Sequence, residues 1–133
     1  MVSGEFLLDR IGGDAALEAA VEGLYSRLVA DEKLAPYFKG VDMNRLKTHQ
    51  RSFFKLAFTK IPESVDVPDL ILNKHKRLFK MGLNADHFDM VAGHLIATFE
   101  SLQVPQALID EAVGIVAPLR SVFEKGAEIA ASA

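Results

Sequence analysis

The chain has 133 residues, of which half are hydrophobic and a quarter are charged, and its formal charge at pH 7 is −3. This composition excludes a disordered, collagen-like or low-complexity chain, and the length fits one globular domain spanning residues 1–133. The absence of cysteine excludes disulfides, thiolate metal sites and thiol catalysis, so any metal must be held by His or carboxylate groups.

Two classes of partner are disfavoured by the sequence. No apolar run approaches the roughly 18 residues that a membrane span needs, and the apolar stretch at residues 6–8 is too short for a secretory signal. We therefore expect a cytoplasmic protein with no membrane partner. The mildly acidic balance argues against sequence-independent binding of nucleic acid.

Apolar spacing predicts helices along the chain, and no segment alternates as a strand would, so we expect an all-α fold. Gly12-Gly13 ends a short N-terminal segment, and Asp14 is the expected N-cap of the first long helix. Asp31 and Pro36 bracket the turn that follows this helix. The inward face of the helix carries Leu17, Val21, Leu24, Tyr25 and Leu28.

A second long helix is predicted between Asp42, which suits its N-cap, and Pro62, which stops it. Residues 63–68 are typical of a loop, and the sequence leaves the path of residues 59–68 open. The inward stripe of this helix carries Leu46, Gln50, Phe53 and Ala57, with Phe54 and Phe58 beside it.

Three further helices are predicted in the second half of the chain. Pro68 suits the first turn of a helix that Gly82 closes. Asn84 caps the next helix, and Pro105 starts the last one, which should bend at Pro118. We expect fraying at residues 1–5 and 126–133. The inward residues are Ile71, Leu72, His75, Leu78 and Phe79 on the first, Phe88, Val91, Leu95, Phe99 and Leu102 on the second, and Leu108, Ala112, Ile115, Leu119 and Phe123 on the third.

Three polar side chains, Tyr25, Gln50 and His75, interrupt these apolar stripes. Burying an unpaired amide or imidazole costs about 1–3 kcal/mol, so each group needs an interior partner, which is protein, water or a ligand. A lone His on such a stripe is more often a satisfied core residue than a ligand, and spacing alone leaves both interpretations open.

The other histidines have weaker signals. Adjacent helical residues point about 100° apart, so Gln50 takes the middle of its stripe and His49 lies at the margin. There His49 is either solvated or a ligand that moves in from the rim. His87 and His94 have no further ligands at suitable spacing, and we expect them to be structural or solvated.

Several short motifs, in order, resemble the truncated haemoglobins of group I over residues 7–123. Periodicity shared among helical proteins would not reproduce this succession. In the first half the motifs are Ile11-Gly12-Gly13, Leu24-Tyr25-Ser26-Arg27, Ala30-Asp31, Leu34-Ala35-Pro36-Tyr37-Phe38, Val41-Asp42-Met43, His49-Gln50 and Phe53. In the second half they are Asp86-His87-Phe88-Asp89, Ala92-Gly93-His94-Leu95, Val104-Pro105, Leu108-Ile109 and Ile115-Val116-Ala117-Pro118-Leu119-Arg120.

The resemblance implies a two-over-two helical globin fold around one haem b. It places the proximal haem ligand at His75 and the distal hydrogen-bond donors at Tyr25 and Gln50. It also places a distal gate at Leu46, and His49 falls where some members have a second axial His. The apolar or aromatic contacts implied are Phe38, Phe53, Phe54 and Phe88, and the expected haem-contacting set is completed by Ile71, Arg77, Leu78 and Val91.

Charged groups near His75 are usually a solvated face, but beside a haem they acquire a second interpretation. Lys76, Arg77 or Lys47 would then pair with the haem propionates, which are costly to leave unpaired at a pocket mouth.

The function implied is reversible binding of dioxygen, nitric oxide or carbon monoxide by a monomer, with bis-histidyl coordination by His75 and His49 when no ligand is present. Two alternatives stay open. One is an enzyme that oxidises nitric oxide and needs a separate reductase as partner, and the other is a haem-free globin that serves as an interaction or signalling module. A haem absorption band separates the last class from the other two.

Overall fold

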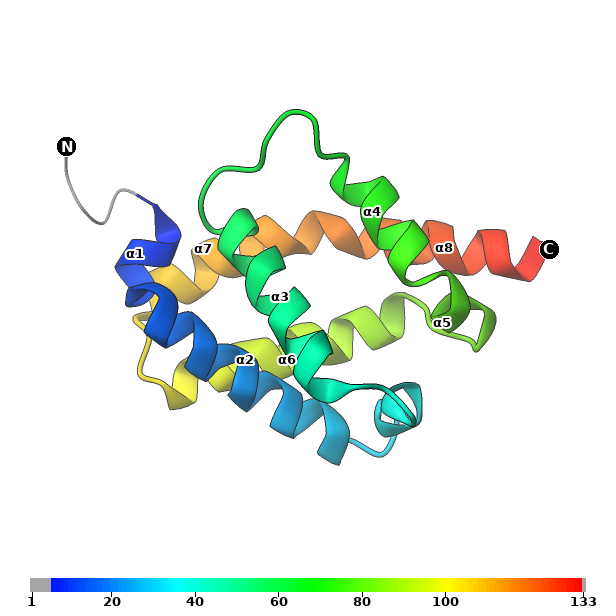
Figure 1. Cartoon of the computed structure of the whole chain (residues 1–133), viewed down its shortest axis with the longest axis horizontal. Helices are drawn as coiled ribbons and strands as arrows, with labels where there is room; N and C mark the ends of the chain where they lie inside the picture. Colours follow the sequence, from blue (N-terminus) through cyan, green and yellow to red (C-terminus); the bar gives the residue numbers. More distant parts are fainter. Residues whose placement is uncertain (1–5, 133) are drawn as a thin grey trace.

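The computed structural model describes residues 6–132, and over this range the chain is helical and contains no strand, which confirms the all-α prediction (Figure 1). The expected fraying of residues 1–5 lies outside the described residues. The elements are α1 (Leu7–Ile11), α2 (Gly13–Ala30), the 3-10 turn η1 (Ala35–Phe38), α3 (Met43–Ala57), α4 (Val67–Lys74), α5 (Lys76–Lys80), α6 (Ala85–Ser101), α7 (Gln106–Val116), the 3-10 turn η2 (Ala117–Leu119) and α8 (Arg120–Ser132).

The main hydrophobic core lies where α2 packs against α3 and α6, with α1 and α7 closing the same end of the molecule (Figure 1). At the other end, α4 and α5 pack against α8. Ile71, Phe79 and Val122, from these three helices, are buried without belonging to the main core. The fully buried centre of the main core is formed by Val21, Leu24, Leu28, Phe58, Phe99 and Ile109.

The first helical corner differs from the prediction at Asp14. Gly12 and Gly13 both have positive φ, 122° and 77°, and Gly12 is the N-cap of α2. The helix therefore begins directly after the corner, and Asp14 lies in its first turn instead of capping it. An acidic side chain there still interacts favourably with the helix dipole.

Helix α3 begins as predicted and ends earlier than predicted. The Asp42 carboxylate accepts the Arg45 N–H at 3.1 Å, which confirms the cap. The helix ends at Ala57 and not at Pro62, because the Phe58 side chain is buried in the core and the Phe58 carbonyl accepts the Leu8 N–H at 3.0 Å. The chain then runs through a turn at residues 62–65 to Pro68, which lies in the first turn of α4 as predicted.

The predicted helix from Pro68 to Gly82 is interrupted at His75. This residue has φ −107° and ψ 7°, and it forms both the C-cap of α4 and the N-cap of α5. Its backbone N–H and its ring Nδ1–H both donate to the Ile71 carbonyl, at 3.0 and 2.9 Å. The side chain thus shares a backbone acceptor with the helix, which a periodicity argument does not anticipate.

The helices after Gly82 begin at the predicted residues, but their ends differ from the prediction. Asn84 caps α6, and Pro118 lies in the η2 turn that separates α7 from α8, as predicted. Leu102 was predicted inward but is 40% exposed, because α6 ends at Ser101 and Leu102 turns out of the helix. Helix α8 continues to Ser132, and Gly126 is buried against the Phe79 ring, whereas the fraying expected from Gly126 stays a prediction.

Candidate functional site

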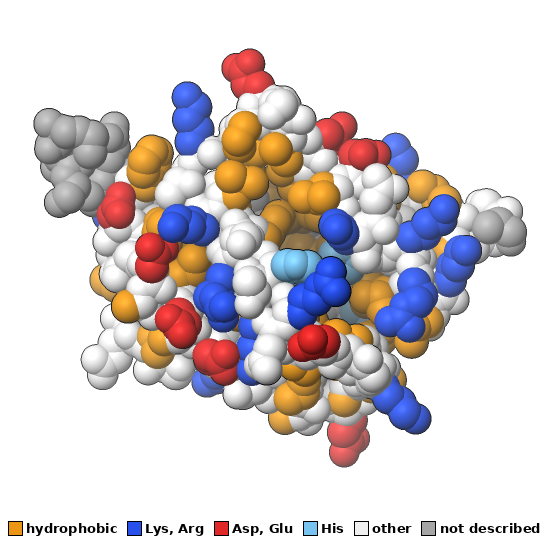
Figure 2. Space-filling view, viewed as in Figure 1, with side chains coloured by type: hydrophobic (Ala, Val, Ile, Leu, Met, Phe, Trp, Pro, Cys, Tyr) orange, Lys and Arg blue, Asp and Glu red, His pale blue; other side chains and the backbone are white. Residues whose placement is uncertain are grey.

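A cavity of about 310 Å³ opens between α2, α3, α4, α5, α6 and α8, beside the main core. Figure 2 shows it as a hollow with hydrophobic side chains at its floor and Lys and Arg side chains at its right-hand side. Its volume lies at the lower end of the range for small-molecule sites, about 300–1,000 Å³. Of the thirteen predicted site residues, twelve line this one cavity: Tyr25, Phe38, Leu46, Gln50, Phe53, Phe54, Ile71, His75, Arg77, Leu78, Phe88 and Val91.

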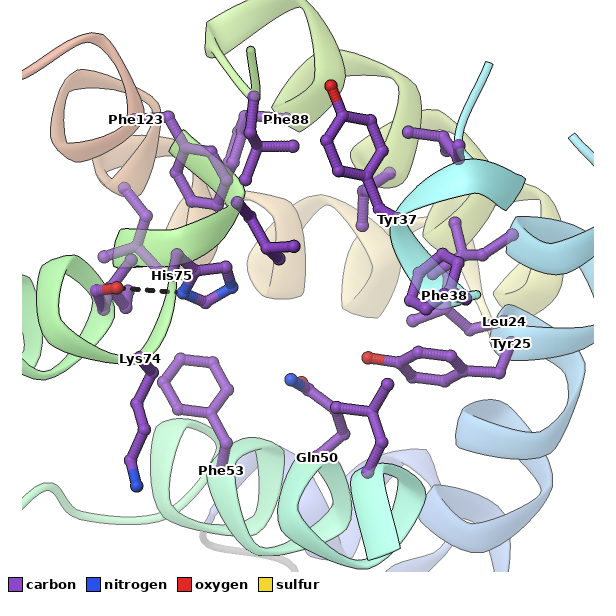
Figure 3. A pocket seen from close by; sticks show the side chains of 18 of the residues that line it. Leu24, Tyr25, Tyr37, Phe38, Gln50, Phe53, Lys74, His75, Phe88 and Phe123 are labelled. Carbon is purple, nitrogen blue, oxygen red and sulfur yellow. Dashed lines mark hydrogen bonds between the residues drawn. The ribbon is translucent and has the colours of Figure 1, made fainter. Parts of the chain in front are cut away.

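The His75 imidazole points into the cavity from the junction of α4 and α5 (Figure 3). Its Nδ1–H donates to the Ile71 carbonyl at 2.9 Å, which fixes the ring and leaves the Nε2 lone pair available. Burial lowers the pKa of this imidazole, and the hydrogen bond to Ile71 only partly offsets that effect. At neutral pH the ring is therefore neutral, the protonation state required of a metal ligand.

Tyr25 and Gln50 point into the same cavity from the opposite side (Figure 3). The Tyr25 ring is 6% exposed and packs edge-on against Phe38, with ring centroids 5.8 Å apart. Burial raises the pKa of the Tyr25 hydroxyl above its ordinary value, so the hydroxyl keeps its proton. Within residues 6–132 the structure gives neither side chain a hydrogen-bond partner at its polar end, so both donors face the cavity.

Aromatic rings form much of the wall around these polar groups. On the His75 side, the Phe123 ring lies 5.5 Å from the imidazole and 5.2 Å from the Phe88 ring. On the α3 side, Phe53 and Phe54 pack edge-on at 5.6 Å. The cavity is therefore a largely apolar slot in which three polar groups converge, and it suits a largely apolar molecule with a few polar atoms.

His49 is the one predicted site residue that does not line the cavity. It lies on α3 next to Gln50, and its side chain is exposed, because the helix turns by about 100° between the two positions. The two other basic residues considered near the site also lie outside the cavity lining. Lys47 pairs with Glu22 at 3.1 Å, and Lys76 is exposed.

Sequence reasoning missed two polar lining residues, Lys74 and Tyr37. Lys74 lies at the rim one residue before His75, and its position in a run of charges was a usable signal. Tyr37 precedes Phe38 in η1, and its hydroxyl lies 3.4 Å from His87 Nε2. Irregular turns have no periodicity, so nothing in the sequence indicated that Tyr37 faces the cavity. The other lining residues not predicted for the site are Leu24, Leu28, Leu34, Val41, Leu83, Ala92, Leu95, Val116, Leu119 and Phe123.

The remaining two histidines have structural partners outside the cavity. His87 Nδ1 accepts the Asn84 N–H at 3.1 Å, which completes a capping box at the start of α6. His94 Nε2–H donates to the Asp31 carboxylate at 2.8 Å and joins α6 to the end of α2. Within the described range, no three His, Asp or Glu side chains gather to hold a metal ion. A metal held by His75 would therefore need donors that do not come from protein side chains, such as those of a porphyrin.

Comparison with known proteins identifies the family of this chain. A sequence model of bacterial-like globins matches residues 6–124. The group 1 truncated hemoglobin GlbN of Mycolicibacterium paratuberculosis is 38% identical over 120 residues, which cover 90% of this chain and 85% of the relative. The chain belongs to the group 1 truncated haemoglobins. Its relative in Synechocystis, also a group 1 truncated hemoglobin GlbN, is 35% identical and covers 82% of this chain and 87% of its own.

Solved structures agree with this family assignment. Chlamydomonas reinhardtii THB4 superimposes with a TM-score of 0.77 at 38% identity, covering 89% of this chain and 94% of its own. The 2/2 hemoglobin of Synechococcus, solved in the cyanomet state with covalently attached heme, gives a TM-score of 0.76 at 36% identity, covering 84% and 90%. The truncated globin fold is therefore confirmed, and haem is the expected cofactor.

The residues of this truncated haemoglobin fit a haem on their own chemistry. A neutral imidazole with a free Nε2 faces two polar donors across an apolar, aromatic-walled slot. Lys74 and Arg77 line the cavity, and their positive charges suit the two carboxylates of a haem. No helix among residues 6–132 is long and apolar enough to cross a membrane.

Proposed function

We propose that this truncated haemoglobin holds one haem b through His75 and reversibly binds a diatomic gas, with dioxygen as the preferred ligand. One observation carries the proposal. The Tyr25 hydroxyl and the Gln50 amide point into the cavity opposite the imidazole, with no hydrogen-bond partner given to them in the described part of the chain. Two such donors at an apolar site favour a ligand that offers an acceptor atom.

His75 supplies the proximal side of the site. Its Nδ1–H is engaged by the Ile71 carbonyl, so the Nε2 lone pair is presented in a fixed direction. The lowered pKa of the ring limits competition from protons for that lone pair. The adjacent Phe123 and Phe79 rings hold the imidazole in place, at centroid distances of 5.5 and 6.1 Å.

A bound haem supplies the iron at which a diatomic gas coordinates, and the distal residues select among such gases. Tyr25 and Gln50 donate to a ligand oxygen that carries partial negative charge, and a hydrogen bond to a charged acceptor contributes about 1.5–3 kcal/mol. Dioxygen polarises in this way far more than carbon monoxide does. Because burial raises the pKa of Tyr25, the hydroxyl stays a donor at physiological pH. The apolar wall excludes bulk water from the same space.

Lys74 and Arg77 hold the haem carboxylates at the rim in this proposal. Both side chains are exposed and line the cavity, whereas Lys47 is already paired with Glu22. Charge-assisted hydrogen bonds from these two residues orient the group without burying a charge.

When no gas is present, His49 would hold the metal of the haem together with His75. Its exposed imidazole reaches the cavity only if α3 shifts or rotates, since Gln50 occupies the inward position. A nitrogen–metal bond offsets the cost of that movement. An exogenous ligand must then displace His49, so its apparent affinity is lowered by the fraction of closed sites.

The test of gas binding uses the purified, haem-loaded and chemically reduced protein. Its absorption spectrum is recorded through repeated cycles of dioxygen and argon at constant pH. Reversible spectral changes over several cycles, with slow loss to the ferric form, are the expected result. Immediate oxidation in the first cycle, or no response to dioxygen while carbon monoxide binds, contradicts a dioxygen-binding function.

A further inference from the structure

The charges of this chain are distributed unevenly along its sequence. Residues 39–80 contain ten Lys and Arg against four Asp and Glu, a formal charge of +6. The rest of the chain contains five Lys and Arg against fourteen Asp and Glu, a formal charge of −9. Residues 39–80 include α3, α4 and α5, which border the cavity. A protein with a net charge of −3 therefore has a strongly basic region around its functional site.

Several basic side chains on α3, α4 and α5 are exposed, and those that do not hold the haem carboxylates are available to a partner. Five of them, which we call the basic face, are exposed, and none forms an ion pair within residues 6–132. By contrast, Arg10, Lys47, Lys55 and Arg120 are each paired with an acidic side chain elsewhere on the molecule. The basic face consists of Arg45 on α3, Lys74 on α4, and Lys76, Arg77 and Lys80 on α5.

The basic face adjoins the opening of the cavity. Lys74 and Arg77 line the cavity themselves, and Lys76 and Lys80 lie on the same short helix as Arg77. Figure 2 shows Lys and Arg side chains gathered beside the hollow, on the side of α4 and α5 in Figure 1. Two carboxylates of a bound haem would lower the charge of residues 39–80 from +6 to +4, which is still strongly positive.

We propose that the basic face docks an acidic one-electron donor protein that keeps the haem in the ferrous state. The inference rests on the proposed function, because gas binding requires ferrous iron. The donor is an iron–sulfur protein with an acidic surface around its cluster. The step transfers one electron from the reduced cluster to ferric iron, giving an oxidised cluster and ferrous iron, with no bond or proton moved.

Electrostatics and size favour this occupant over other polyanions. Complexes between electron-transfer proteins are small, weak and steered by complementary charge. This suits the basic face, where Lys76 and Lys80 share the short helix α5 with the lining residue Arg77. A nucleic acid or an anionic membrane presents an extended negative surface, which the −9 charge of the rest of the chain repels. Electron transfer also requires the donor to lie close to the haem, and two residues of the basic face, Lys74 and Arg77, line the cavity that would hold it.

The test follows reduction of the ferric, haem-loaded protein by a reduced, acidic plant-type [2Fe–2S] ferredoxin. Carbon monoxide is present to trap the ferrous product, and the reaction is followed by stopped-flow absorbance. The second-order rate constant should fall about tenfold or more between low and high ionic strength. Lys76→Glu should lower it about tenfold at low ionic strength, and Lys80→Glu should act in the same direction.

Lys33→Glu is the matched control, because it makes the same charge change on an exposed residue outside the basic face. Its rate constant should stay within about twofold of the wild-type value. Reduction by dithionite and the spectrum of the carbon monoxide complex should be unchanged in all three variants, which keeps a damaged haem site distinct from a lost docking site.

Two results overturn the proposal. One is a ferredoxin rate that is insensitive to salt, or equally lowered by Lys76→Glu and Lys33→Glu. The other is salt-dependent sedimentation of the protein with phosphatidylserine vesicles that Lys76→Glu abolishes while the ferredoxin rate stays the same, since this assigns the face to a membrane. Failure of reversible dioxygen binding, with normal reduction by ferredoxin in the presence of carbon monoxide, contradicts only the proposed function.

Discussion

At the level of single residues, the Tyr25 hydroxyl is the group with the sharpest predicted effect. Tyr25→Phe removes the donor and leaves the ring that packs on Phe38. A hydrogen bond to a charged acceptor contributes about 1.5–3 kcal/mol, so dioxygen should dissociate at least about tenfold faster from this variant. Carbon monoxide, a poorer acceptor, should respond less. The measurement is flash photolysis or ligand-replacement kinetics with both gases. Equal acceleration of both would show that Tyr25 acts through packing or gating.

His49 is predicted to control the coordination of the haem without an added ligand. The wild-type protein should be six-coordinate and low-spin, and His49→Ala should convert it to a high-spin form that binds exogenous ligands faster. Absorption spectra of the ferric and ferrous forms of both proteins provide the measurement. A wild-type spectrum that is already high-spin, or that does not change on substitution, would leave His49 as the exposed residue seen in the structure.

Some residues of the site could be predicted from the sequence, and others could not. Tyr25, Gln50 and His75 stood out because each is polar on an apolar stripe, and all three line the cavity. Tyr37 gave no such signal because it lies in a 3-10 turn. His49 was placed at the margin of its stripe by helical geometry, and the structure agrees, whereas its ligand role came only from family resemblance and stays a prediction.

At the level of elements, the contact between α8 and α5 depends on the small size of Gly126. A Cβ at this position would overlap the Phe79 ring, whereas a Cβ at Gly114, on α7, would meet no atom within 4 Å. Gly126→Ala should therefore lower the free energy of unfolding by about 1–3 kcal/mol through overpacking. The higher helix propensity of Ala offsets a small part of this loss. Gly114→Ala should raise it by up to about 1 kcal/mol.

Urea denaturation of both variants, followed by circular dichroism, checks this prediction. The Phe79 ring packs near the His75 imidazole, so Gly126→Ala should also loosen haem retention. Equal stabilisation of the protein by both substitutions would show that α8 can move away from α5 at no cost, and that the close approach at Gly126 has no role.

The link between α2 and α6 gives a prediction about pH. The hydrogen bond from His94 is the main cause that lowers the pKa of Asp31 below its ordinary value of 3.8, and the Lys33 N–H contributes. A carboxyl group whose pKa is lower in the folded than in the unfolded protein stabilises the folded state at pH values above the pKa of the unfolded protein. This contribution to stability is lost as the pH falls through the pKa of the folded protein. Asp31→Asn should therefore lower Tm at pH 7, with a difference that narrows as the pH falls below about 3.8.

Thermal melts of Asp31→Asn and wild-type protein between pH 7 and pH 3 measure this difference. Glu32→Gln removes one carboxylate from the neighbouring exposed position and serves as the control. A Tm difference that is the same at every pH would contradict the assignment of this stabilisation to the carboxylate.

For the whole molecule, helix number and order were largely predictable, because caps and stops are local signals. Asp42, Asn84 and Pro68 occupy the predicted positions at helix starts. The break at His75 was not predictable, because it depends on a side chain sharing the Ile71 carbonyl with the backbone. The extension of α8 to Ser132 was missed for a related reason, since burial of Gly126 against Phe79 is a long-range contact.

The cavity itself cannot be recognised from hydrophobic periodicity. An apolar side chain that lines a cavity and one that fills a core occupy the same stripe, so Phe53 and Phe88 have the pattern of core residues. Only the polar interruptions and the family resemblance pointed to a ligand. In the structure the cavity lies between the main core and the helices α4, α5 and α8, so a bound haem would complete the interior and should stabilise the fold by linkage.

The central claim, that His75 holds a haem in this cavity, is tested most directly by an optical titration. The haem-free protein and its His75→Ala variant are titrated with haem, with and without added imidazole, and followed at the main haem absorption band. Saturation at one haem per wild-type chain is expected, with loss or severe weakening in His75→Ala and partial recovery on addition of imidazole. A variant that takes up haem with the wild-type spectrum and affinity in the absence of imidazole would contradict the claim.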